Sequence, residues 1–127
     1  MISIADVTAL PLDIELTEAF GIATGAQHVA NNVLVTLTLS DGTVGTGEAA
    51  PFPAVNGETQ SAVLEALGAA RSSLVGVDAL RWRPAVVVAE HALRGTASAL
   101  AALESALLDA LCRRARVSLW AFFGGAH

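Results

Sequence analysis

The sequence has 127 residues with a formal net charge of −5, and 54% of its residues are hydrophobic. A chain of this length fits one domain with a modest core, and the hydrophobic content excludes a disordered protein. It contains no lysine, so neither a nucleic acid nor an anionic membrane surface is an expected partner.

Other features of the composition point to a cytoplasmic protein. No apolar run approaches the roughly 18 residues that a transmembrane helix needs. The first residues include Asp6 and no basic cluster, so no signal peptide is expected. Cys112 is the only cysteine, which excludes an internal disulfide and suits a reducing compartment.

Residues 1–50 alternate between apolar and polar positions with the period of two that is typical of β-strands. The alternation is clearest where one face carries Val33, Val35, Leu37 and Leu39. Asp41-Gly42 follows and predicts a hairpin with a tight primed turn. The segment therefore predicts a three-stranded antiparallel meander.

Two glycines interrupt the last of these strands. Gly45 and Gly47 lie in its sequence "TVGTGEAA". Glycine inside a strand indicates either a bulge or the close approach of another backbone. Both alternatives are open from the sequence.

From residue 59 onward the apolar residues recur with a period near 3.6, which predicts helices over 59–123. The first helix begins with Thr59 or Gly57 as its cap, and Glu58 is favourable near its N-terminus. A second helix has Pro84 in its first turn and ends at Gly95.

A third helix, opened by Thr96 or Ser98, carries leucines along one side and Arg113 and Arg114 at its C-terminal end. The predicted fold class is α+β: a three-stranded antiparallel meander followed by a three-helix bundle. The whole chain, 1–127, is predicted to form one domain.

Three stretches, taken in order, resemble the N-terminal capping domain of the enolase superfamily. They are "ALPLDIELTEAF" at 9–20, "NNVLVTLTLSDGTVGTGEAAPFPAVNGET" at 31–59, and "ALESALLDALCRRARVSLWAFFGG" at 102–125. The resemblance is to the muconate lactonizing enzyme subgroup of the mandelate racemase/muconate lactonizing enzyme family, which includes dipeptide epimerases and o-succinylbenzoate synthases. Arg116 and Ser118 depart from the family pattern, since glycine and proline usually stand there.

In this family a TIM-type barrel follows the capping domain, holds Mg²⁺ on three carboxylates and uses lysine bases. The sequence contains no lysine, and its carboxylates are not spaced as metal ligands. The resemblance therefore implies that the barrel is absent from this chain, that the chain alone is inactive, and that catalytic residues and Mg²⁺ belong to the barrel. The implied partners are that barrel and a small carboxylate or dipeptide substrate, with a homo-oligomer as a further candidate.

The resemblance also implies a role for two loops, "FGIATG" at 20–25 and "PFPAVNGE" at 51–58. In the family they fold over the barrel mouth and contact the substrate away from the reacting carbon. The matching specificity positions are Phe20, Ile22 and Val55, with Thr24 and Asn56 as neighbouring candidates. Without the resemblance, the three apolar residues could equally belong to the core.

Glu48 invites a catalytic interpretation, but it is expected to hydrogen-bond the second loop or to meet the barrel. The resulting hypothesis is that the chain is the substrate cap of a Mg²⁺-dependent isomerase. Dipeptide epimerisation is the preferred reaction. Caps of a muconate cycloisomerase or an o-succinylbenzoate synthase are alternatives. A stand-alone interaction module without catalysis is the alternative from another class.

Overall fold

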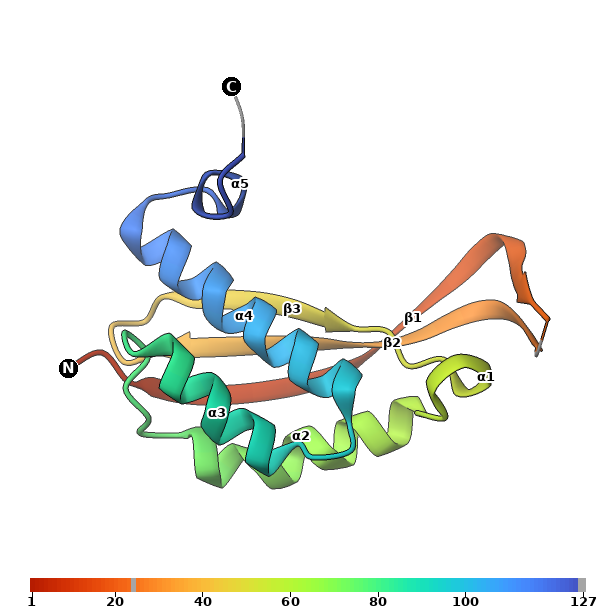
Figure 1. Cartoon of the computed structure of the whole chain (residues 1–127), viewed down its shortest axis with the longest axis horizontal. Coiled ribbons are helices and arrows are strands. Elements are labelled where there is room, and N and C mark those ends of the chain that lie inside the picture. The colour runs from red at the N-terminus through yellow and green to blue at the C-terminus, as the bar shows by residue number, and fades with distance from the viewer. Residues whose placement is uncertain (24, 126–127) are drawn as a thin grey trace.

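The computed structural model describes residues 1–23 and 25–125. It contains one antiparallel sheet whose three strands lie in the order β1-β2-β3. The strands are β1 (Ile4–Ile22), β2 (Gly25–Leu39) and β3 (Val44–Ala49). Three longer helices cover one face of this sheet, and one end of the β1–β2 hairpin extends beyond them as an arm (Figure 1). The predicted meander and the α+β class are confirmed.

Apolar residues at every second position of β2 form the part of the core that the sheet provides. Val33, Val35, Leu37 and Leu39 are at most 1% exposed, whereas the residues between them are half-buried. Successive side chains of a strand point to opposite faces, so one face packs against the helices. The predicted core face of this strand is confirmed.

The turn between β2 and β3 differs from the predicted two-residue primed turn. Gly42 has a φ of 88°, but Asp41 does not share the left-handed conformation. The Gly42 amide donates to the Leu39 carbonyl at 2.9 Å, and the Leu39 amide donates to the Thr43 carbonyl at 2.8 Å. This is a type I turn followed by a left-handed glycine, which gives a longer hairpin loop.

The helices are α1 (Pro53–Asn56), α2 (Gln60–Leu74), α3 (Trp82–Ala92), α4 (Ala97–Ala115) and α5 (Leu119–Phe122). The Thr59 hydroxyl accepts a hydrogen bond from the Ala62 amide at 3.2 Å, so Thr59 caps α2 as one of the two predicted candidates. α3 ends at Ala92, not at Gly95 as the sequence predicts, and the chain then reaches Thr96, the N-cap of α4.

The glycines of β3 allow α4 to lie directly on the sheet. A Cβ atom at Gly45 would overlap the Ala106 carbonyl, and one at Gly47 would overlap the Ala102 carbonyl. Of the two alternatives that the sequence leaves open, close backbone approach is therefore the correct one. Asp109 adds to this contact, because its carboxylate accepts from the Thr46 amide at 2.9 Å.

The C-terminal end of α4 contains an unusual backbone conformation. Arg116 has a φ of 56°, the left-handed conformation that ends many helices and that glycine usually adopts. The single turn α5 follows, with Trp120, Phe122 and Phe123 exposed. None of the helices within residues 1–23 and 25–125 combines the length and apolarity that crossing a bilayer requires.

Candidate functional site

The first predicted loop is the tip of the long β1–β2 hairpin. Phe20 pairs with Gln27, and Ile22 pairs with Gly25. Between Glu15 and Phe20 the register shifts, so β1 bulges before the tip. Strand pairing therefore continues to Ile22, and most of the predicted first loop is the paired end of the hairpin. Thr24, a predicted site residue, lies outside the described residues.

The second predicted loop contains the one-turn helix α1. Pro53 opens it, and Gly57 closes it with a φ of 72°. The Asn56 side chain serves this turn: its Oδ1 accepts from the Phe52 amide at 3.3 Å and from the Glu58 amide at 3.0 Å. Asn56 is thus engaged within its own loop, and its contact with a substrate remains a prediction.

The two loops contact each other. The rings of Phe20 and Phe52 are 5.8 Å apart between centroids, with a tilt of 55°. A Cβ atom at Gly25 would lie 2.9 Å from the Ala54 Cβ, so backbone and side chain meet closely there as well. The hairpin tip and α1 therefore form one continuous surface, which we call the paired-loop surface (residues 20–23, 25 and 52–57).

Three apolar side chains of the paired-loop surface are open to solvent. Phe20 is 55% exposed, Ile22 is 39% exposed and Val55 is 64% exposed. The alternative that these residues belong to the core is therefore wrong. Their exposure leaves apolar area available for contact with another molecule.

The chain carries no arginine before Arg71. Arg71 is already paired, because its Nε donates to Asp6 at 2.7 Å. The paired-loop surface itself thus contains no cationic side chain, and it offers shape and apolar contact.

Glu48 and Glu58, which stand on either side of α1 in the sequence, have structural partners. Glu48 accepts from the Asn32 Nδ2 at 2.7 Å, so this hydrogen bond goes to β2 and not to the second loop. The alternative that Glu48 meets the barrel stays a prediction. Glu58 is expected at the N-terminus of the helix that follows it, yet its carboxylate faces the Ser98 amide in α4, at 3.3 and 3.4 Å. Within the described part of the chain, no three His, Cys, Asp or Glu residues are placed to hold a metal ion.

Two contributors to this region were missed by sequence reasoning. Phe52 holds the Phe20 ring, and Glu58 links α1 to α4. The motif G-E-T indicated that the segment around Glu58 matters. The partner of Glu58, Ser98, is however 40 positions away. Local helix-capping rules could not find it.

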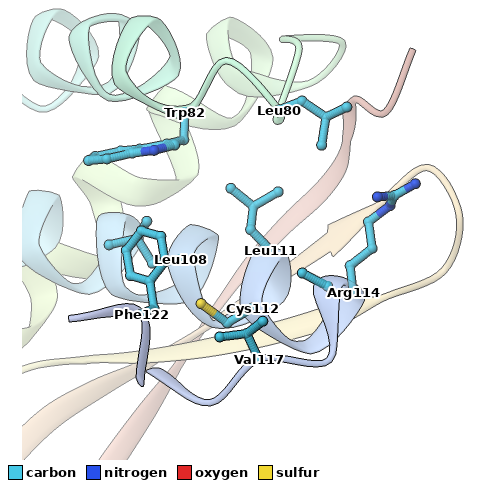
Figure 2. Close-up of a pocket in the computed structure, with 9 residues that line it drawn as sticks. Leu80, Trp82, Leu108, Leu111, Cys112, Arg114, Val117 and Phe122 are labelled. Atoms are coloured by element: carbon cyan, nitrogen blue, oxygen red, sulfur yellow. The ribbon is translucent and has the colours of Figure 1, made fainter. Parts of the chain in front are cut away.

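An apolar cavity lies between α3, α4 and α5 (Figure 2). The C-terminal end of α4 and α5 lie at the opposite end of the molecule from the hairpin tip (Figure 1). Trp82, Leu108, Leu111 and Phe122 are among its lining residues, and the Cys112 sulfur lies beside them (Figure 2). Burial raises the pKa of the Cys112 thiol, and the charge of Asp109 raises it further. The thiol therefore stays neutral near neutral pH, which disfavours nucleophilic chemistry.

Comparison with known proteins identifies the family of this chain. A sequence profile described as "Mandelate racemase / muconate lactonizing enzyme, N-terminal domain" matches residues 4–124. An aromatic dipeptide epimerase of Herpetosiphon aurantiacus is 48% identical over 123 residues, which are 97% of this chain and 35% of that protein.

Solved structures of this family have the same fold as this chain. A mandelate racemase/muconate lactonizing protein from Herpetosiphon aurantiacus has a TM-score of 0.91 at 48% identity, over 97% of this chain and 34% of that one. A dipeptide epimerase from Cytophaga hutchinsonii, complexed with Mg and the dipeptide D-Ala-L-Val, has a TM-score of 0.91 at 27% identity, over 98% and 34%.

The chain thus spans about a third of the length of the relatives it matches. The profile match covers nearly all of its residues and confirms the resemblance that its motifs predict. The chain belongs to the mandelate racemase/muconate lactonizing enzyme family of the enolase superfamily, and it is the N-terminal domain of that family.

Proposed function

We propose that this domain caps the active site of a dipeptide epimerase and helps to set its substrate specificity. The observation that carries the proposal is the paired-loop surface, which presents Phe20, Ile22 and Val55 to solvent on one shaped, uncharged patch. The 48% identity to an aromatic dipeptide epimerase supports this reaction over muconate cycloisomerisation and o-succinylbenzoate synthesis.

The chemistry assigned to this chain is binding and exclusion of water. Closing an active site strengthens electrostatic interactions inside it and commits the substrate to reaction. The described residues do not fit a Mg²⁺ site. In this proposal, the metal and the acid–base residues therefore belong to a second, barrel domain, and no step of the reaction is assigned to residues described here.

The proposal also predicts the character of the substrate. Burying a carboxylate against Phe20, Ile22 and Val55 without a cationic partner would cost several kcal/mol. Burying an apolar side chain there would gain about 25 cal/mol per Å². A dipeptide with an apolar or aromatic side chain distal to the reacting carbon is the favoured substrate, unless the barrel supplies a cation.

A domain exchange tests the proposal. The N-terminal domain of the Herpetosiphon aurantiacus relative would be replaced by residues 4–124 of this chain, which is the span of the family match. The chimera is assayed with a dipeptide library in D₂O by mass spectrometry, and the relative's second domain alone serves as the control. We expect deuterium incorporation with the chimera well above that control.

A folded chimera that gives no exchange above the isolated second domain would contradict the capping role. That result would favour the stand-alone interaction module. Turnover of muconate or of an o-succinylbenzoate precursor by the natural full-length protein, without exchange of any dipeptide, would instead contradict the assigned reaction.

A further inference from the structure

Glu58 is unusual because it is a charged residue in a buried position. It is 9% exposed, and among residues 1–23 and 25–125 it is the one charged residue that is buried. It stands between Gly57, which closes α1, and Thr59, which caps α2. A buried carboxylate requires hydrogen-bond partners that replace its lost hydration.

The partner on one side is the N-terminal turn of α4. Both Glu58 oxygens lie within 3.4 Å of the Ser98 amide nitrogen, and Ser98 is the second residue of that helix. Thr96, at the N-cap, provides no side-chain hydrogen bond to the helix. Glu58 therefore caps α4 from a distant segment of the chain, because the residues next to the helix provide no side-chain cap. Its negative charge is also favourable at the positive end of the helix.

The partner on the other side is α1. The Asn56 Nδ2 donates to the Glu58 Oε2 at 3.1 Å, while the Asn56 Oδ1 accepts from the Phe52 and Glu58 amides. Phe52 in turn carries the ring contact with Phe20. A continuous series of contacts thus runs from α4 through Glu58 and the α1 turn to the hairpin tip.

We infer that Glu58 is a positioning residue that tethers α1 to the N-terminus of α4 and so fixes the paired-loop surface. Its carboxylate contacts the paired-loop surface at Asn56 and acts on the rest of that surface through Asn56 and Phe52. The consequence for substrate selection rests on the proposed capping function. The tether itself is a property of this chain and is testable without any substrate.

The first test is amide hydrogen exchange of the 127-residue chain by NMR. The reporters are the amides of Val55, Asn56 and Gly57, which donate to the carbonyls of Phe52 and Pro53 within α1. We expect Glu58→Ala to speed their exchange at least tenfold, because a hydrogen-bonded charge contributes substantially to local stability. Glu58→Gln should restore much of the protection, since one oxygen at the Oε2 position can accept from both Ser98 and Asn56.

Thr59→Ala is the matched control. The Thr59 hydroxyl caps the neighbouring helix α2 by accepting from the Ala62 amide at 3.2 Å. The substitution removes this cap and leaves the Glu58 contacts intact. We expect it to lower the Tm without selectively exposing α1. The tether is overturned if Glu58→Ala leaves the three reporter amides protected, or if Thr59→Ala speeds their exchange equally.

The second test places the same variants in the chimera described above. Glu58→Ala should raise KM for apolar dipeptides at least fivefold and change kcat less, while Thr59→Ala leaves KM near that of the unmutated chimera. An unchanged KM in an active Glu58→Ala chimera would overturn the positioning role in substrate selection. An inactive unmutated chimera would instead overturn the proposed function, and the exchange experiment would still decide the tether.

Discussion

Gly47 of β3 lies so close to the Ala102 carbonyl of α4 that the two backbones are in contact where a side chain would otherwise stand. Gly45 repeats this relationship with Ala106 one helical turn along. The helix and the sheet are therefore held together at a distance that only glycine permits on the strand side.

Gly47→Ala should destabilise the domain by about 3 kcal/mol, because the added Cβ must push α4 away from the sheet. Chemical denaturation of the two proteins measures the difference. Gly68→Ala is the control, since it lies in α2 with open space around it. That variant should raise the free energy of unfolding by about 0.5–1 kcal/mol through helix propensity. Equal effects of the two substitutions would contradict the close-packing argument.

Arg116→Gly should stabilise the domain by about 0.5–1 kcal/mol, because a left-handed conformation is costly for a residue with a Cβ. Its φ of 56° is the observation behind this prediction. Arg116→Ala keeps the Cβ and removes only the guanidinium, so it should remain near the original stability. If both variants gained the same stability, charge and not backbone conformation would be the cause.

The ion pair between Asp6 and Arg71 predicts a pH dependence. The hydrogen bond from Arg71 lowers the pKa of Asp6 below its ordinary value of 3.8. The stabilisation is therefore present above that value and is lost as the pH falls through the lowered pKa of the folded state. The Tm difference between the original protein and Asp6→Asn should be largest near neutral pH and should shrink as the pH falls below 3.8. In an Arg71→Met background the difference should already be small at neutral pH, and a full-sized difference there would contradict the assignment.

Substitution at the hairpin tip should change substrate ranking. In the chimera, Ile22→Arg should improve turnover of acidic dipeptides relative to apolar ones by about tenfold, because it provides a charged hydrogen-bond donor. Val44→Arg is the control: Val44 is 42% exposed, close to the 39% of Ile22, but it lies at the start of β3. If the original chimera already prefers acidic dipeptides and Ile22→Arg leaves the ranking unchanged, the tip does not set specificity.

The exposed aromatic residues of α5 predict self-association of the isolated chain. Trp120 is 55% exposed and Phe123 is 69% exposed, and adjacent apolar residues of this kind favour contact with other molecules. Phe123→Ser should weaken association in sedimentation velocity at high concentration. Leu10→Ser, which removes a residue of 62% exposure on β1, should not. A monomer at every concentration would contradict this prediction.

The sequence predicted those parts of the fold in which burial imposes a period. The face of β2 from Val33 to Leu39 and the helices α2 and α4 were predicted, because one side of each is buried and its apolar residues recur accordingly. The extension of β1 to Ile22 was not, since both faces of the arm are exposed and no alternation is required there. α1, with four residues, is too short to show a helical period.

The candidate site was predicted only in part, and not from periodicity. The family resemblance indicated Phe20, Ile22 and Val55, and the structure places them on one exposed surface. The contacts that hold this surface join residues far apart in the chain, such as Phe20 with Phe52 and Glu58 with Ser98. Such contacts follow from the folded arrangement of the elements and leave no local pattern.

The length of the β1–β2 arm has a consequence for how this domain can change over generations. Between residues 8 and 32, no described side chain is fully buried, so the arm contributes little to the core. A substitution near its tip therefore carries little risk of unfolding the domain. Mutations that alter ligand preference can accumulate there without first acquiring compensating changes elsewhere. A mutagenesis library confined to 16–22 should accordingly contain a high proportion of folded members.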